Sequence, residues 1–323
     1  MTFPLNVYLP AFLGALLTTF GTLPLWRRWC RTTGLVDEPG HRKIHSEPIP
    51  LAGGLAVFAG MAAPLLVAVV VASAQRLPVS ALPLTHGLGK RGGQLAVIML
   101  GALGMLILGW WDDKRELRPI AKFAGQILIA AAVAASGVRI TLFIPSVEVS
   151  FALTILWILT VTNALNFMDN MNGLCTGLGV IGCAWFALSA AVAGQYLVAL
   201  LALLASGALL GFLPYNFPKA SAFLGDSGSH LVGYLLAVLA ILPHYYTAEH
   251  PSTLAVLVPL LILAIPLGDL VWVVLLRLRL GKPFYLGDTN HLSHRLVRRG
   301  LSPRTAVLVI WLLAAVTGSI PFW

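Results

Sequence analysis

Charged side chains are scarce in this chain. They make up 10% of its 323 residues, whereas apolar residues make up 58%. A soluble domain carries about 25% charged residues. A chain this poor in charge has too little polar surface to face water on all sides, so we expect lipid to be its main solvent.

Cysteine is rare as well, and its spacing indicates neither a metal site nor a disulfide framework. Cys30, Cys175 and Cys183 lie in or beside apolar runs and form no CxxC pair. This pattern predicts buried, unpaired thiols. The N-terminus lacks a basic segment before its first apolar run, which argues against a cleavable signal peptide.

Long apolar runs are abundant, and ten of them could each cross a bilayer as a helix. They lie near residues 7–26, 51–74, 93–111, 120–137, 151–167, 174–194, 196–213, 229–244, 253–276 and 304–321. The longest outer segment, about residues 75–92, reads as an ordinary loop. The sequence therefore predicts an all-α, polytopic integral membrane protein with about ten transmembrane helices, folded as a single domain over residues 1–323.

Basic residues fall mainly on one side of the predicted membrane. Of the 21 lysines and arginines, 17 lie in alternate loops or at their helix ends, and the exceptions are Arg76, Lys90, Arg91 and Arg139. Positive loops face the cytosol. We therefore expect both termini outside, five cytosolic loops, and a place in the cytoplasmic (inner) membrane. The net charge of +9 is then mainly topological, and nothing indicates binding to nucleic acid.

Carboxylates gather on the same side, which topology does not require. Of 12 acidic residues, only Glu148 and Glu249 fall on the outer side, and Asp269 falls within the predicted ninth span, toward its cytosolic end. An ionised group in hydrocarbon is costly unless it faces a polar cavity. The cytosolic acids are therefore candidate functional residues.

The first acidic motif is the pair Asp112 and Asp113 at the cytosolic end of the third span. Adjacent carboxylates repel each other, so keeping both ionised requires a cation or a basic partner. The pair suits binding of Mg²⁺ or a base beside a phosphate. A solvated helix end would explain it as well.

An amide-rich segment lies between the fifth and sixth spans. Asn163, Asn166 and Asp169 recur every three residues, which would place them along one helical face, and Asn172 follows. So many amides beside a carboxylate are costly between apolar spans unless they meet polar ligands. A helix cap ending at Gly173 accounts for only one or two of them, so a binding role is favoured.

Gly225 and Asp226 open the eighth span, with hydroxyl residues directly after them. Glycines there allow backbone amides at a helix N-terminus to approach a phosphate. A structural N-cap by Asp226 is the alternative.

The last motif contains His291, His294 and Arg295, with Arg298 one turn further on. On a helix, these side chains would share a face. Two imidazoles and the planar guanidinium groups suit a pyrophosphate. A basic segment touching lipid is the alternative. The histidine spacing also permits zinc, but the neighbouring oxygen ligands favour a hard cation.

In this order, the four motifs and the first cytosolic loop resemble the polyprenyl-phosphate N-acetylhexosamine-1-phosphate transferases. The bacterial branch that uses UDP-GlcNAc and undecaprenyl phosphate looks closest, and the resemblance runs from about residue 34 to residue 304. It implies transfer of a sugar 1-phosphate from a UDP-sugar to polyprenyl phosphate, with UMP as the second product, as the first membrane step of cell-surface polysaccharide synthesis. It also implies Mg²⁺ as the cofactor, with Mn²⁺ as the alternative, and suggests a homodimer.

The motifs and the resemblance together assign roles to individual residues. Catalysis falls to Asp112, Asp113 and Asp169, and metal binding falls to Asp226 with Asp113. Substrate binding falls to Lys43, His45, Asn163, Asn166, Asn172, Asp269, His291, His294 and Arg295. Direct attack by the acceptor phosphate and a route through an aspartyl-phosphate both remain open.

This chain departs from the pattern of the resembled family at two places. Relatives usually read Asp-Gly-x-Asp-Gly where this chain has Asp169, Asn170, Met171, Asn172 and Gly173. They also usually carry a further histidine where Ser293 stands. Both places lie close to the nucleotide sugar in relatives, so the identity of the sugar stays open.

Three other classes of protein share some of these sequence features. A cation-coupled transporter would place its acids near the membrane midplane, often within inverted repeats, neither of which is seen here. A CDP-alcohol phosphotransferase would carry four aspartates on a DG-x-x-AR pattern, which is absent. A catalytically altered relative acting as a scaffold would fit the departures at Asn172 and Ser293.

Overall fold

The computed structural model describes residues 3–39, 47–73, 82–141, 145–243, 245, 256–283, 285 and 288–322. In this part of the chain, one short hairpin of β1 (Val36–Asp37) and β2 (Ile49–Pro50) accompanies a bundle of helices. The helices are α1 (Leu5–Thr33), α2 (Gly53–Ser73), α3 (Leu82–Arg115), α4 (Pro119–Ala135), α5 (Val147–Phe167), α6 (Leu174–Val192), α7 (Tyr196–Asn216), α8 (Gly225–Ile241), α9 (Val258–Ile262), α10 (Ala264–Arg279), α11 (Leu292–Arg298) and α12 (Pro303–Ser319).

The apolar runs do form helices, as predicted. Seven helices in the described residues are long and apolar enough to cross a bilayer, namely α1, α2, α3, α5, α6, α7 and α12. Helices α4 and α8 are apolar but shorter, with 17 residues each. All three cysteines are buried and unpaired. The prediction of an all-α, multi-pass membrane protein is therefore confirmed.

Two expectations about helix ends are wrong. The segment 75–92 is not all loop, because α3 already begins at Leu82. Hydropathy marks the lipid-embedded part of a helix and not its polar extension. The predicted ninth span is broken at Leu263 into α9 and α10, and residues 253–255 lie outside the described part. Pro266 cannot donate to the carbonyl of Ile262, so the helix restarts with this proline in the first turn of α10.

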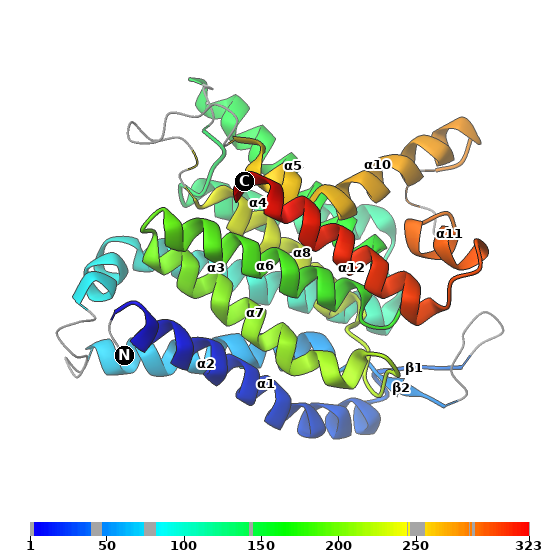
Figure 1. Ribbon diagram of the computed structural model, residues 1–323, viewed down its shortest axis with the longest axis horizontal. Coiled ribbons are helices and arrows are strands. Elements are labelled where there is room, and N and C mark those ends of the chain that lie inside the picture. Colours follow the sequence, from blue (N-terminus) through cyan, green and yellow to red (C-terminus); the bar gives the residue numbers. More distant parts are fainter. Residues whose placement is uncertain are drawn as a thin grey trace.

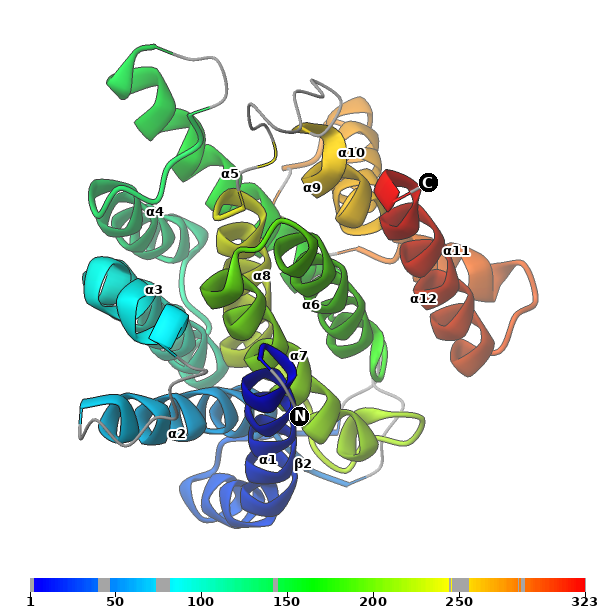
Figure 2. The same ribbon diagram turned by 60° about the vertical axis from the view of Figure 1, so that its left-hand side comes forward.

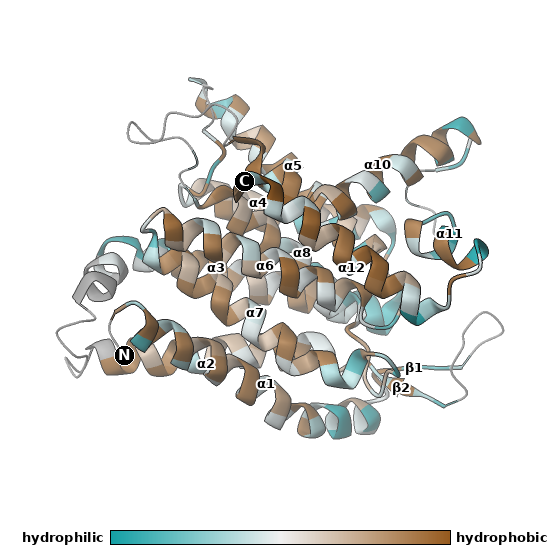
Figure 3. Cartoon of the chain, in the orientation of Figure 1, coloured by the Kyte–Doolittle hydropathy of each residue, from teal (hydrophilic) through white to brown (hydrophobic). Residues whose placement is uncertain are grey.

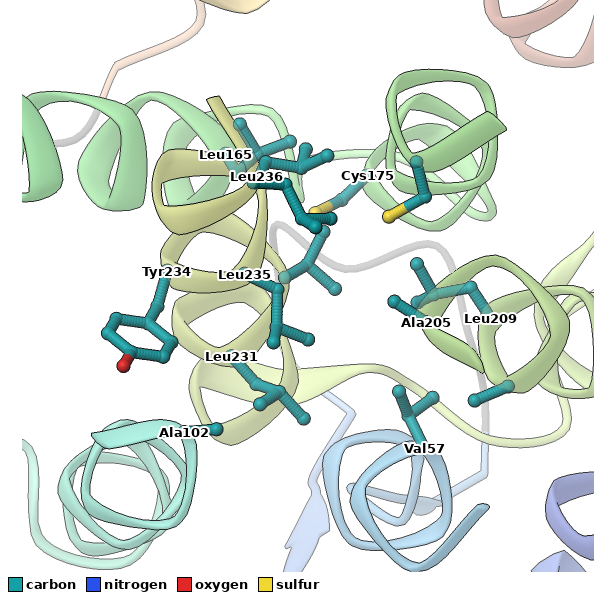
Figure 4. Packing of buried hydrophobic residues seen from close by; sticks show 14 of the residues in the cluster. Val57, Ala102, Leu165, Cys175, Ala205, Leu209, Leu231, Tyr234, Leu235 and Leu236 are labelled. Atoms are coloured by element: carbon teal, nitrogen blue, oxygen red, sulfur yellow. The ribbon is translucent and has the colours of Figure 1, made fainter. Parts of the chain in front are cut away.

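Helix α8 lies at the centre of the bundle (Figure 2). Almost all of its residues are buried, and it packs against α2, α3, α5, α6 and α7. In Figure 4, Leu231, Tyr234, Leu235 and Leu236 extend from α8 toward the helices around it. A helix that is apolar on all sides is typical of a protein interior. Neighbouring helices therefore shield α8 from lipid.

Glycines let α2 and α3 approach the N-terminus of α8 closely. A Cβ atom on Gly109 of α3 would lie 2.3 Å from the backbone oxygen of Asp226. One on Gly54 of α2 would lie 2.6 Å from the backbone nitrogen of Gly228. Only glycine fits at such contacts. They bring the end of α3, with Asp112 and Asp113, against the start of α8.

Polar residues are concentrated at one end of the bundle. The β1–β2 hairpin and α11 lie at that end, and the two chain termini lie toward the other (Figure 1). Hydrophilic residues are concentrated around the hairpin and α11, whereas the helix bodies between the ends are mostly hydrophobic (Figure 3). The functional candidates are found at this polar end.

Candidate active site

A cavity of about 1880 Å³ lies at the polar end of the bundle. Loops and helix ends from α1 to α12 contribute to its wall. Among its polar lining residues are Asp112, Asp113, Lys122, Asn163, Asn166, Asp169, Asn170, Asn172, Asp226 and His294. Predicted site residues from three separate motifs therefore line the same cavity, together with one residue of the histidine motif.

The ammonium group of Lys122 joins two of the acids. Its Nζ lies 2.6 Å from Oδ2 of Asp112 and 3.2 Å from Oδ2 of Asp226. The other oxygen of Asp112 accepts the N–H of Leu117 at 2.8 Å, which turns the chain after α3. Sequence reasoning counted Lys122 only as a topological charge. Its position one turn inside α4, beside acids from other helices, was not visible in the linear pattern.

Asp113 caps the N-terminus of α8. Its Oδ1 accepts the backbone N–H of Asp226 at 2.7 Å, and its Oδ2 accepts that of Ser227 at 3.0 Å. These donors carry the positive end of the helix dipole, which favours a carboxylate. Both oxygens of Asp113 are thus already engaged. The cap considered as the alternative role of Asp226 is supplied by a residue more than a hundred positions earlier.

The two amides of α5 face different partners. Nδ2 of Asn166 donates to Oδ1 of Asp226 at 2.6 Å and to the hydroxyl of Ser229 at 2.9 Å. Nδ2 of Asn163 donates to Oε1 of Gln126 on α4 at 2.7 Å. Asn166 therefore joins Asp112, Asp226 and Lys122, and we call this group the acid centre. Asn163 instead lies at the cavity wall and holds α5 to α4.

Asp169 lies beyond the end of α5, so the predicted helical face through Asn163, Asn166 and Asp169 is wrong at its last member. The helix ends at Phe167 because the chain turns there toward α6, whose N-cap is Gly173 in the left-handed region. Burial, together with the negative charges of Asp226 and Asp113, raises the pKa of Asp169 to about 8. Asp169 is thus held near its titration point at neutral pH.

Asn172 and Asn216 connect the loop after α5 with the loop after α7. Nδ2 of Asn172 donates to the backbone oxygen of Pro218 at 3.3 Å. Oδ1 of the buried Asn216 accepts from the N–H of Gly173 and the hydroxyl of Thr176, both at 2.9 Å. Sequence reasoning missed Asn216, although a lone amide at the end of an apolar span was a usable signal.

The histidine motif does not form the predicted shared face, because α11 begins only at Leu292. His291 is the N-cap residue of α11, and its Nδ1 lies 2.6 Å from Oδ2 of Asp269. Oδ1 of Asp269 accepts the N–H of Leu292 at 2.6 Å. Asp269 and His291 are 5% and 4% exposed, and neither lines the cavity. They hold α11 in place against α10.

His294 is the residue of this motif that lines the cavity. Burial and the nearby charges of His291 and Arg298 hold the pKa of His294 below its usual value. Arg295 instead lies over the ring of Trp272, with its guanidinium carbon 4.5 Å from the ring centre. The remaining predicted site residues, Lys43 and His45, lie outside the described residues.

The oxygen donors of the acid centre fit a hard divalent cation by their chemistry. Carboxylates from Asp112 and Asp226 meet at the ammonium of Lys122, which shows that this position favours positive charge. Oxygen ligands of this kind suit Mg²⁺ and Mn²⁺. In the described residues, no three His, Cys, Asp or Glu side chains are already arranged as a metal site. The donor set is therefore suitable, and the binding of metal stays a prediction.

Comparison with known proteins identifies the class of membrane protein that this fold and cavity define. Residues 95–244 match the model of glycosyl transferase family 4. The chain is 32% identical over 311 residues to a Bacillus subtilis protein named a probable undecaprenyl-phosphate N-acetylglucosaminyl 1-phosphate transferase, covering 94% of this chain and 81% of that protein.

Two further relatives extend the comparison. A decaprenyl-phosphate N-acetylglucosaminephosphotransferase of Mycobacterium tuberculosis is 35% identical, with 92% of this chain and 77% of the relative covered. An Escherichia coli undecaprenyl-phosphate alpha-N-acetylglucosaminyl 1-phosphate transferase is 27% identical, with 93% and 80% covered. The chain belongs to glycosyl transferase family 4, in the group of polyprenyl-phosphate N-acetylglucosaminyl 1-phosphate transferases.

Proposed function

We propose that this protein transfers N-acetylhexosamine 1-phosphate from a UDP-sugar to a polyprenyl phosphate, with release of UMP. The main support is that one cavity brings together the side chains of Asp112, Asp226, Asn166 and Lys122. The relatives support it, because they match more than nine-tenths of the chain and their names specify a polyprenyl phosphate and N-acetylglucosamine.

We further propose that ten spans cross the cytoplasmic membrane, with both termini outside and the cavity facing the cytosol. The support is the excess of lysine and arginine at the polar end of the bundle. A lipid substrate would then reach the cavity from the inner leaflet, and a nucleotide sugar would reach it from the cytosol. A homodimer stays a prediction from the resemblance.

The acceptor phosphate oxygen attacks the β-phosphorus of the donor. The bond from that phosphorus to the oxygen of the α-phosphate breaks, and UMP leaves. Asp169, with its pKa of about 8, can take the proton of the acceptor phosphate when it is in its ionised form. Lys122 and His294 line the same cavity and offer donors to phosphate oxygens. A divalent cation bound by Asp226, Asp112 and Asn166 would offset charge on the pyrophosphate.

The test is product formation by the purified full chain. Labelled UDP-GlcNAc, undecaprenyl phosphate and Mg²⁺ should give a labelled lipid pyrophosphate and UMP. Asp226→Asn removes the charge at the centre of the cluster and should reduce the rate at least about a hundredfold, the scale of losing one key electrostatic contact. Glu148→Gln is the matched control, because this exposed carboxylate lies in the first turn of α5 and accepts a hydrogen bond from the hydroxyl of Ser146.

The results separate the alternatives. Absence of labelled lipid with any UDP-sugar tested would reject the transferase and favour a scaffold. Full activity in Asp226→Asn would remove the acid centre from the mechanism. Omitting the cation, or replacing Mg²⁺ with Mn²⁺, tests the cofactor in the same assay.

A further inference from the structure

A hydrogen bond joins the neighbours of two cavity-lining residues. Ser293, next to His294, donates from its Oγ to Oδ1 of Asn170 at 2.6 Å. Asn170 directly follows Asp169, and its Nδ2 donates to the backbone oxygen of Phe167 at 2.7 Å. The bond therefore connects the end of α5 and the Asp169 loop with α11, which lies more than a hundred residues later.

The buried surroundings leave room for only small side chains at this hydrogen bond. Ser293 is completely buried. Its Oγ lies 2.6 Å from the amide oxygen of Asn170, so a larger side chain at position 293 would meet that amide. The amide also uses both of its ends, because its oxygen accepts from Ser293 and its nitrogen donates to Phe167. Buried polar groups held in this way tend to fix a single arrangement.

We propose that Asn170 and Ser293 act as a positioning pair that sets where Asp169 and His294 stand relative to each other across the cavity. Asn170 also lines the cavity, whereas Ser293 does not. The pair acts through Asp169 and His294, and its catalytic consequence rests on the proposed function.

The first test is a double-mutant cycle in the transfer assay. Ser293→Ala removes one neutral hydrogen bond and should lower kcat/KM roughly fivefold, equivalent to about 1 kcal/mol. Asn170→Ala should cost more, because the Phe167 contact is lost too. The double variant should be no worse than Asn170→Ala alone, since coupled residues are not additive. Multiplicative losses would overturn the proposal.

The second test distinguishes positioning from mere loss of stability. Ser293→His should lower activity at least about tenfold, because overpacking a filled site displaces its neighbours. Adding Asn170→Gly removes the overlapping amide and should restore activity to about the level of Asn170→Gly alone. Thermal unfolding of the same variants is measured alongside, and a recovery of activity that exceeds the recovery of Tm indicates positioning. Failure of the rescue would reject the pair.

Amide hydrogen exchange of residues 292–298 provides a readout that does not depend on activity. Ser293→Ala should accelerate exchange in α11, whereas Ser206→Ala should not. Ser206 is a suitable control because it is also buried, on α7, with one long hydrogen bond of 3.4 Å. If the wild-type protein makes no lipid product, the proposed function fails, and exchange alone then decides the pair. Unchanged exchange in Ser293→Ala would overturn it in either case.

Discussion

Replacing Lys122 tests how the acid centre is held together. The Nζ of Lys122 lies between Asp112 and Asp226, at 2.6 Å and 3.2 Å from their Oδ2 atoms. Lys122→Met keeps most of the length of the side chain and removes the charge. The two carboxylates would then face each other without compensation. We expect a protein that folds but is markedly less stable without divalent cations.

The magnitude follows from the burial of the three groups. The side chains of Lys122 and Asp112 are 18% and 9% exposed, whereas that of Asp226 is 34% exposed. Removing one partner of a buried ion pair costs about 3–5 kcal/mol. Because Asp226 is partly solvated, we expect the lower end, about 3 kcal/mol. For a chain of this size, that lowers Tm by roughly 4 °C.

The assay is thermal unfolding in detergent with and without Mg²⁺. Lys282→Met is the matched control, because this exposed lysine follows α10 at the polar end. Binding to the folded state stabilises it by mass action. In the wild type, an added cation competes with the ammonium, whereas in Lys122→Met it meets uncompensated carboxylates. Mg²⁺ should therefore raise Tm more in Lys122→Met than in the wild type.

Two results would refute this reasoning. In one, Lys122→Met is as stable as Lys282→Met in the absence of Mg²⁺. In the other, Mg²⁺ raises Tm equally in the wild type and in Lys122→Met. Either result would mean that the ammonium does not compensate the two acids.

Three further predictions concern the supports of the site. Asp269→Ala leaves the first N–H of α11 and the His291 ring without their acceptor. Amide hydrogen exchange in α11 should therefore accelerate, and transfer activity should fall about tenfold or more, as for a lost charge-assisted hydrogen bond. Unchanged exchange would contradict this. Gly109→Ala places a Cβ 2.3 Å from a backbone oxygen of α8 and should lower Tm, whereas Gly21→Ala, on a helix with open space, should leave Tm unchanged or raise it slightly. The third is a pH effect. The pKa of Asp169 is about 8 in the fold and about 4 when unfolded, so its contribution to stability is full below about pH 4 and is lost as pH rises to about 8. Asp169→Asn should therefore show a smaller fall in Tm between pH 6 and pH 8.5 in metal-free buffer, and an equal fall would refute the assignment.

Hydrophobic patterning accounts for what the sequence predicted well. Long apolar runs must form helices in lipid, because each backbone polar group needs a partner within its own segment. The same argument does not locate helix ends that reach beyond the lipid. It therefore placed the bodies of the helices correctly and missed the start of α3 at Leu82 and the break at Leu263.

Contacts between distant segments account for what the sequence did not predict. The seven-residue α11 has no capping side chain of its own, and its N-terminus is held by Asp269 from α10. A helix this short is not stable through its own sequence, so periodicity does not reveal it. Asp113 and Lys122 are similar cases, because each contacts the first turn of α8, which becomes a neighbour only when glycines allow the helices to meet.

The charges of the protein side chains at the acid centre favour the binding of cations over the binding of phosphates. Asp112, Asp113 and Asp226 bring three carboxylates, and Lys122 brings one ammonium. The N-terminus of α8 compensates part of the charge on Asp113, since its first N–H groups carry about half a positive charge. Asp169, with its pKa of about 8, adds little further negative charge at neutral pH. An excess of carboxylate therefore remains, and it would repel any phosphate-bearing substrate at contact distance. Arg27, Arg31, Lys219 and Arg304 bring positive charge to other parts of the same cavity wall. A divalent cation bound among the carboxylates, as proposed above, would offset the remaining negative charge beside the phosphates.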